Sequence, residues 1–262
     1  MSVDESPFRV LMVCTANICR SATAQLTLSA YLDAHRPLAE VPLAEVEVMS
    51  AGVAAVAGYP MCDTSSQLLV AAVAESAVNA EVDVLALAPD ATRAHVSRRL
   101  TPELVLDADL VLTADRSHRG AVVQVAPSAR SRVFTLRQAA QLATWIVGDS
   151  EILPVAGELA AGRANPFPAD DPRALTAPLP TGARARLTWL VEEMDANRGM
   201  APRNVAALET QLDSAAWHED DVEDPHVAGW ALHESSVATI MTAVADIGSA
   251  MLAAQAGTRR RD

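Results

Sequence analysis

The stretch that decides the fold is residues 8–21, which read FRVLMVCTANICRS. Phe8–Val13 is a short apolar run with β-branched residues, and this pattern predicts a buried strand. Cys14–Ser21 is a polar loop, and residues 22–35 repeat apolar side chains at helical spacing. A buried strand, a tight polar loop and a helix in direct succession indicate the start of a strand–helix–strand unit.

The same alternation continues along the first half of the chain. Further strands are predicted at 45–49, 109–113 and 132–136, and helices at 63–78, from Pro102 onward and at 115–125. Strands that alternate with helices form parallel sheets with right-handed crossovers and bind ligands at the carboxyl ends of the strands. We therefore expect an α/β fold: a doubly wound four-stranded parallel sheet with helices on both faces.

The alternation stops between about residues 138 and 220. Pro and Gly cluster at 165–180, helices are predicted at 183–196 and 204–216, and a long helix at 231–254 follows. We expect one domain over residues 1–262, with a mainly helical insertion at about 138–220. This insertion should fold back beside the functional site and cover it.

Composition excludes several classes of protein. Half of the 262 residues are apolar, which excludes general disorder, and the net charge of −13 argues against nucleic acid and anionic membrane surfaces. The acidic, polar start does not resemble a signal peptide, and no apolar run reaches the roughly 18 residues of a membrane span. Three Cys residues do not make a disulfide framework. A cytoplasmic protein without membrane insertion is expected.

The loop itself carries the chemistry. Cys14 and Arg20 enclose five residues between a strand and a helix. Inward-facing backbone N–H groups and the helix dipole form an anion cradle there, and such a cradle stabilises a nucleophilic thiolate. Arg20 offers a planar fork that matches two phosphoryl oxygens, and the Ser21 hydroxyl can reach the thiolate. The alternative is that Cys14 is a small buried hydrophobe at a strand end.

The motif resembles the loop of the low-molecular-weight protein tyrosine phosphatase family, Cys-x-Gly-Asn-x-Cys-Arg-Ser-Pro. The resemblance covers residues 8–137 and a C-terminal piece, through Ser50-Ala51-Gly52, His95–Thr101, Asp109–Asp115 and Phe134–Arg137. Two positions depart from it. Ala16 replaces the loop Gly, where a Cβ costs about 1 kcal/mol if φ is positive. Ala22 replaces the Pro and loses only a pre-set first helical turn.

The resemblance implies roles for the loop and its neighbours. Cys14 is the nucleophile, and the residues that bind phosphate are Thr15, Ala16, Asn17, Ile18, Cys19 and Arg20. Ser50 and His95 would join Asn17 and Ser21 in a network that supports the loop. Asp115 either orients Arg20 or caps the next helix. Cys19 either forms a protective disulfide with Cys14 or is a buried spectator.

Transfer of a phosphoryl group to Cys14 needs a general acid, and two Asp-Pro pairs compete for that role. Asp224-Pro225 directly precedes the final helix, in the order that the resemblance implies, whereas Asp171-Pro172 follows a Pro-rich stretch. We therefore expect Asp224 to be the acid. Trp230 and His233 either wall the site or serve packing.

The expected reaction is hydrolysis of phosphomonoesters through a phosphocysteine, without metal or cofactor. His218, His226 and His233 lack a recognised metal-ligand spacing, and Cys62 is expected to be a spectator. The expected partner is a phosphotyrosine-containing protein, such as a bacterial tyrosine kinase, and Ile18 is typical of phosphotyrosine-specific members. Two alternatives are a phosphate- or phosphoprotein-sensing module with little turnover, and arsenate reduction. Arsenate reduction requires Cys residues beyond Cys62, and the chain has none.

Overall fold

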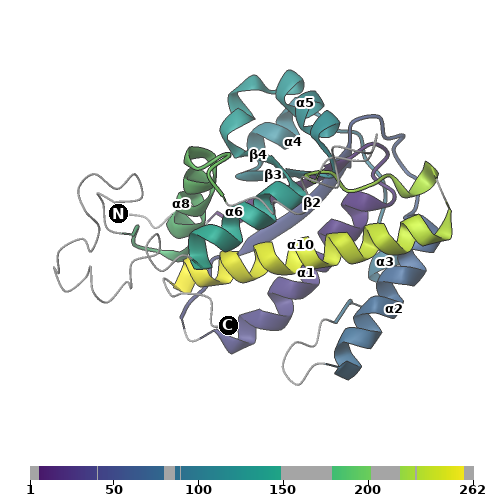
Figure 1. The fold of residues 1–262 in the computed structure, drawn as a ribbon, viewed down its shortest axis with the longest axis horizontal. Coiled ribbons are helices and arrows are strands. Elements are labelled where there is room, and N and C mark those ends of the chain that lie inside the picture. Colours follow the sequence, from purple (N-terminus) through teal and green to yellow (C-terminus); the bar gives the residue numbers. More distant parts are fainter. Residues whose placement is uncertain are drawn as a thin grey trace.

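The computed structural model shows the predicted parallel sheet at the centre of the molecule (Figure 1). It describes residues 6–39, 41–79, 86–88, 90–148, 179–201, 219–227 and 229–256. The strand order is β2-β1-β3-β4, and every pair is parallel. The strands are β1 (Phe8–Cys14), β2 (Val46–Gly52), β3 (Leu110–Thr113) and β4 (Val133–Thr135). The predicted doubly wound sheet is confirmed.

Successive residues of a strand point to opposite faces of the sheet. Because both faces here carry apolar side chains, helices cover both of them. Val10 and Met12 of β1 face one core, which is built with α1 (Arg20–His35), α6 (Leu136–Gly148), α8 (Ala183–Ala196) and α10 (Trp230–Ala256). Leu11 and Val13 face the other core, with α4 (Pro102–Asp107) and α5 (Arg116–Val125). Figure 1 shows α4 and α5 on one side of the sheet and α1, α6 and α10 on the other.

The other elements that the structure describes are α2 (Asp63–Asn79), α3 (Ala91–Ala94) and the short 3-10 turns η1 (Arg36–Leu38), η2 (Pro127–Arg132) and η3 (Pro225–Val227). The predicted helices at 63–78 and 183–196 are confirmed, and α1 begins two residues before the predicted position. The predicted helix at 204–216 and most of the 165–180 segment lie outside the described residues.

Helix α6 was not predicted. It follows β4 without a loop, and the Thr135 hydroxyl accepts a hydrogen bond from the Gln138 N–H at 3.3 Å, as a helix cap does. Its apolar side chains face the core at helical spacing; those buried are Leu136, Ala139, Ala140, Leu142, Ala143, Ile146 and Val147. A core helix therefore lies where the end of the strand–helix alternation predicted the start of the insertion.

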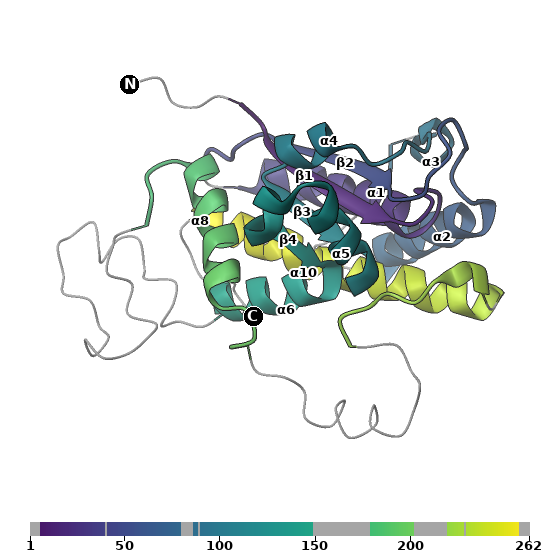
Figure 2. The same ribbon diagram turned by 90° about the horizontal axis from the view of Figure 1, so that it is seen from above.

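Helix α8 lies at the amino ends of the strands, away from the predicted loop. Arg184 near its start bonds Asp109, just before β3, and the Ser6 carbonyl, just before β1. Arg198 just past its end donates to the carbonyls of Arg130, Ser131 and Val133 around the start of β4. In two perpendicular views α8 lies at the opposite end of the sheet from α2 and α3 (Figures 1 and 2). Of the predicted insertion, α8 therefore lies away from the predicted loop, and residues 149–178 and 202–218 lie outside the described residues.

Helix α10 is long and apolar enough to cross a membrane by length and composition, alone in this respect among the described residues. However, 56% of its most apolar window is buried inside the protein. It packs against α1, α2, α6 and α8, which is the packing of a core helix. Its first turn reaches the carboxyl end of the sheet, where the functional residues gather.

Candidate active site

The predicted phosphate-binding loop lies at the carboxyl end of β1, between the β2 and β3 sides of the sheet. The chain crosses over in opposite directions from β1 at this point, which is where doubly wound sheets bind ligands. The Cys14 sulfur accepts a hydrogen bond from the Asn17 backbone N–H at 3.3 Å and lies 3.0 Å from the Ser21 hydroxyl oxygen. The first residue of α1 is Arg20, so the loop ends at a helix N-terminus. This arrangement is compatible with the anion cradle predicted from the sequence, which we call the cradle.

Asn17 organises the loop from within. It is fully buried and adopts a left-handed backbone conformation with φ of 58°. Its side-chain NH₂ donates to the hydroxyls of Ser21 at 2.9 Å and Ser50 at 2.8 Å. Its backbone carbonyl lies 2.8 Å from His95 Nε2, and its side-chain oxygen accepts from the Arg98 N–H. The structure thus brings together Asn17, Ser21, Ser50 and His95, as the resemblance implies.

Burial lowers the pKa of His95, and the nearby Arg98 guanidinium lowers it further against the opposing hydrogen bond with Asn17. The neutral imidazole is therefore favoured, and its Nε2–H can donate to the Asn17 carbonyl. A neutral His95 supports the loop without adding a competing cation beside the cradle.

The left-handed position in the loop is Asn17 rather than Ala16. Among the described residues, the non-glycine residues with positive φ are Asn17 and Asp90. The Cβ of Ala16 therefore carries no left-handed penalty, and Asn is one of the few residues that tolerate that conformation. Replacement of the family's loop Gly is compatible with the cradle.

The loop backbone passes closest to another strand at Gly52, the last residue of β2. A Cβ built there would lie 2.6 Å from the Thr15 carbonyl oxygen and 2.8 Å from the Asn17 backbone nitrogen. Both neighbours belong to the loop backbone, so neither can move without distorting the cradle. Gly52 is paired with Cys14 in the sheet register, which fixes its position.

We expect Gly52→Ala to destabilise the protein by about 3 kcal/mol and to slow the phosphomonoester hydrolysis predicted from the sequence, because the methyl group must displace loop backbone. Urea denaturation and a hydrolysis assay measure the two effects. The matched control is Gly120→Ala inside α5, where nothing lies within 4 Å of the added Cβ. A Gly52→Ala protein as stable as this control would contradict the assignment of the close approach.

Arg20 connects the loop to the opposite wall of the site. Its side chain is only 4% exposed, and Nη1 donates to Asp115 at 3.2 Å and to the Val222 carbonyl at 3.0 Å. Its Nη2 donates to the Thr15 hydroxyl at 3.2 Å and to an Asp224 carboxylate oxygen at 2.6 Å. One buried guanidinium therefore contacts the loop, Asp115 just after β3, and residues 221–226, which we call the acid segment because they contain the predicted acid Asp224.

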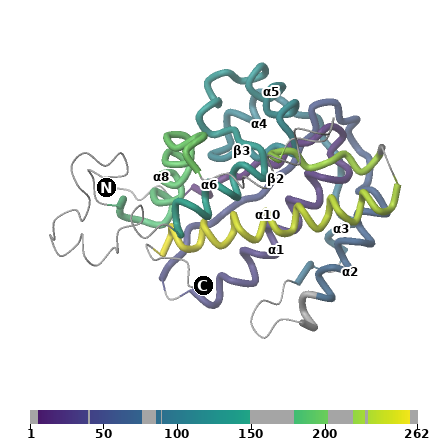
Figure 3. The backbone as a smooth tube through the Cα atoms, in the orientation of Figure 1, coloured from purple at the N-terminus to yellow at the C-terminus, as the bar shows by residue number. Residues whose placement is uncertain are grey.

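The acid segment is fixed to the sheet immediately before Asp224. The Val222 N–H donates to the Ala114 carbonyl at 2.8 Å, and the Asp221 carboxylate accepts from the backbone and side chain of Arg116. The tube in Figure 3 shows this segment passing beside the start of α1. The other Asp224 carboxylate oxygen accepts from the His226 N–H at 3.1 Å, and Asp171 lies outside the described residues.

Asp115 combines both of the roles left open by the sequence. It caps α5 by accepting from the His118 N–H at 2.9 Å, and its second oxygen pairs with Arg20. Burial alone would raise the pKa of Asp115, but hydrogen bonds from His118 and Ser117 outweigh it and hold the pKa well below its usual range. The lowered pKa favours the ionised carboxylate, which pairs with the Arg20 guanidinium beside the loop.

Two residues at the site were missed by sequence reasoning, His118 and Asp221. His118 is 3% exposed and its Nε2 lies 2.8 Å from the Thr15 hydroxyl, so it links α5 to the loop. Its position three residues after the helix-capping Asp115 was a usable signal. No sequence signal pointed to Asp221 except its acidic neighbours, because its partner Arg116 is 105 residues away in sequence.

Cys19 faces away from the network around Cys14. Its sulfur lies 3.1 Å from His226 Nε2, and burial, followed by the neighbouring Cys62, raises the pKa of its thiol far above the ordinary value. His233 is buried and faces Cys62, whereas Trp230 is 56% exposed. Of the two residues proposed to wall the site or serve packing, His233 is thus buried and Trp230 is largely exposed.

The first half of the chain matches a known family. The model described as "Low molecular weight phosphotyrosine protein phosphatase" matches residues 9–149. A protein-arginine-phosphatase of Geobacillus stearothermophilus is 32% identical over 132 residues, which cover 50% of this chain and 71% of that protein. The probable low molecular weight protein-tyrosine-phosphatase EpsP of Ralstonia nicotianae is 31% identical over 132 residues, 50% of this chain and 72% of its own.

Solved structures are similar to the chain over a longer span but at lower identity. One is the solution structure of a low molecular weight protein tyrosine phosphatase from Bacillus subtilis, which is 17% identical in sequence. The match covers 92% of this chain and 95% of that protein, with a TM-score of 0.47. The corresponding phosphatase from T. tengcongensis is also 17% identical, with coverages of 92% and 97% and a TM-score of 0.45.

Proposed function

Since the chain belongs to the low molecular weight phosphotyrosine protein phosphatase family, whose members are hydrolases, we propose that Cys14, Arg20 and Asp224 perform its phosphatase reaction. The observation that carries this assignment is the position of Arg20, which contacts Thr15 of the cradle and Asp224 of the acid segment with the same nitrogen. A phosphate bound in the cradle would therefore lie beside the only Asp-Pro carboxylate that the described residues place there.

The reaction has two steps. The Cys14 thiolate attacks phosphorus, the S–P bond forms as the P–O bond breaks, and Asp224 gives its proton to the leaving oxygen. Water then attacks the phosphocysteine, Asp224 takes a proton from that water, and the thiolate leaves with the Ser21 hydroxyl 3.0 Å from its sulfur. The loop N–H groups and Arg20 stabilise the charge on the equatorial oxygens in both steps. Neither step requires a metal.

The preferred substrate is a phosphotyrosine-containing protein, such as a bacterial tyrosine kinase, in the cytoplasm. The segment after Gly52 runs along the cradle, because Val53 and Cys62 donate backbone hydrogen bonds to Cys14 and Ile18. Between them the segment exposes apolar surface, with Val56 65% and Tyr59 58% exposed. Exposed apolar side chains beside an anion cradle favour a phosphorylated aromatic ring. No nucleic acid partner and no membrane insertion are proposed.

A second candidate substrate is phosphoarginine, because one relative is a protein-arginine-phosphatase. The decisive experiment compares hydrolysis of p-nitrophenyl phosphate, a phosphotyrosine peptide and a phosphoarginine peptide by the full chain. We expect turnover of the first two and a lower kcat/KM for phosphoarginine. A preference for phosphoarginine would reverse the substrate assignment. No turnover of any substrate, together with retained phosphate binding, would favour the sensing module.

We expect Asp224→Asn to lower kcat for an aryl phosphate by about 10²- to 10⁴-fold, because the amide cannot give a proton to the leaving oxygen. Asp171→Asn is the matched control and should leave kcat unchanged. The loss should be larger for substrates with poor leaving groups, which need the proton most. A larger loss in Asp171→Asn than in Asp224→Asn would overturn the choice of acid.

A further inference from the structure

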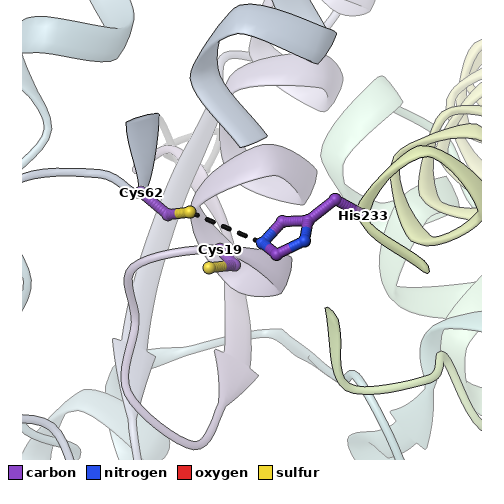
Figure 4. A group of neighbouring side chains, drawn as sticks. All are labelled: Cys19, Cys62 and His233. Carbon is purple, nitrogen blue, oxygen red and sulfur yellow. Dashed lines mark hydrogen bonds between the residues drawn. The ribbon is translucent and has the colours of Figure 1, made fainter. Parts of the chain in front are cut away.

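Three potential metal ligands from separate parts of the chain meet beside the phosphate-binding loop. The sulfurs of Cys19 and Cys62 and a ring nitrogen of His233 all lie within 4.8 Å of one another. Cys19 precedes α1, Cys62 precedes α2, and His233 lies in the first turn of α10 (Figure 4). Within this group, Cys62 Sγ lies 3.6 Å from His233 Nε2. The proposed hydrolysis uses none of these three side chains as a reacting group.

A fourth potential ligand, His226, lies next to Cys19 but outside the set of three whose ligand atoms are all within 4.8 Å of one another. His226 Nε2 lies 3.1 Å from Cys19 Sγ, and the His226 and His233 rings meet edge to face with centroids 5.8 Å apart. Ligand atoms on a tetrahedral zinc, at about 2.3 Å for sulfur and about 2.0 Å for nitrogen, are about 3.3 to 3.8 Å apart. The sulfur–nitrogen distances of 3.1 Å for Cys19 and His226, and 3.6 Å for Cys62 and His233, are close to that range.

His233 is held in the form that binds a metal. Its Nδ1 lies 3.0 Å from the Gly229 carbonyl oxygen, so this nitrogen carries the proton and donates to the carbonyl. The lone pair of the neutral ring is therefore on Nε2, the atom that faces Cys62. A histidine ligand whose other nitrogen donates to a backbone carbonyl is the usual arrangement at metal sites.

We propose that Cys19, Cys62, His226 and His233 form a Cys₂His₂ site for a structural zinc ion. Two thiolates and two neutral imidazoles leave the bound Zn²⁺ with no net charge, which suits a partly buried place. Binding displaces one proton from each thiol, so two protons are released per zinc. Cys14 is not part of the set, because its sulfur is engaged by Ser21 and by the Asn17 N–H.

The site would join the segments that build the active site. Cys19 belongs to the cradle, and His226 lies two residues after Asp224, so the metal would fix the acid segment against the loop. Cys62 and His233 would add the starts of α2 and α10. Sequence spacing did not reveal this set, because four ligands on four separate segments have no local motif. The site thus departs from the expectation that no metal binds.

The test uses the full-length chain, stripped with a chelator under reducing conditions, reloaded with Zn²⁺ and dialysed. We expect about one zinc per chain by elemental analysis. In Cys62→Ser and in His233→Asn we expect the zinc affinity to fall by at least about 100-fold. Cys14→Ser is the matched control, since it removes a thiol of the same loop and should retain the zinc. Cobalt binding gives a second measurement, because tetrahedral thiolate coordination has intense visible and charge-transfer absorption.

Several outcomes would overturn the proposal. These are a wild-type chain without stoichiometric zinc, equal zinc in all variants, loss of zinc in Cys14→Ser, or a cobalt spectrum without thiolate charge transfer. A Cys19–Cys62 disulfide that persists under the reducing conditions would do so as well. If a variant does not fold, the cobalt spectrum of the wild-type protein alone decides. Because metal content is measured without a phosphate substrate, failure of the zinc site and failure of the proposed phosphatase reaction are distinguishable.

Discussion

Cys14→Ser is expected to abolish hydrolysis of p-nitrophenyl phosphate, with kcat lower by on the order of 10⁴-fold or more. A serine hydroxyl does not ionise near neutral pH, so the cradle that stabilises a thiolate has no nucleophile to stabilise. The hydrogen bond from the Asn17 N–H and the contact with Ser21 fit a hydroxyl as well as a sulfur. The measurement is steady-state kinetics near pH 6 on the purified variant.

The cradle of Cys14→Ser should still bind anions, because its N–H groups and Arg20 are untouched. Inorganic phosphate is therefore expected to raise the melting temperature of the variant as it does that of the wild type. Gly120→Ala inside α5, where nothing lies within 4 Å of the added Cβ, is the control variant and should retain turnover. Residual activity of Cys14→Ser near that of the wild type would show that another group attacks phosphorus.

Arg20→Lys is expected to lower kcat/KM by about 10³-fold. Lysine keeps the charge that pairs with Asp115 and Asp224, but it loses the planar fork that binds two phosphoryl oxygens at once. Replacement by alanine is a poorer test, because Asp115 would be left as a buried carboxylate without its arginine partner. Kinetics and a melting temperature on the same protein separate lost chemistry from lost stability.

Arg116→Lys is the matched control for charge near the site. Arg116 also pairs with an aspartate of the acid segment, Asp221, but its side chain is 52% exposed. Lysine keeps the charge that faces the buried Asp221, and the cation itself is half exposed, so the substitution should cost about 1 kcal/mol or less and activity should fall less than about tenfold. Equal losses in Arg20→Lys and Arg116→Lys would mean that Arg20 acts through general electrostatics and does not bind phosphate directly.

The sequence predicted the sheet well because local signals suffice for it. The apolar run before Cys14 and the helical repeat after it define β1 and α1 within two residues at each boundary. Strand β2 extends beyond the predicted end at Met49 to Gly52, because its ladder with β1 continues to Cys14. Helix α6 escaped prediction because it begins directly at the end of β4, and the Thr135 cap was read as part of a strand.

Prediction of the site succeeded where residues belong to one motif and failed where folding joins distant ones. Cys14, Asn17, Arg20 and Ser21 share a single loop, so spacing alone grouped them. The resemblance added Ser50 and His95, which do contact Asn17 directly or through its backbone. No sequence rule predicts that Cys19 contacts His226 or that Cys62 contacts His233. Those contacts depend on how α2 and α10 pack against the rest of the fold.

The contacts of Val222 have a consequence for how the protein is made. A ribosome releases the cradle first and the acid segment about 200 residues later, although the two meet through Arg20 and the Val222 carbonyl. Closing such a long interval costs little free energy, since each doubling of loop length adds only about 0.6 kcal/mol. Contacts so distant in sequence do, however, form late during folding. A nascent chain would therefore contain the proposed nucleophile, Cys14, long before the proposed acid, Asp224, and we expect no hydrolysis until the segment around Val222 has docked on Ala114 and Arg20.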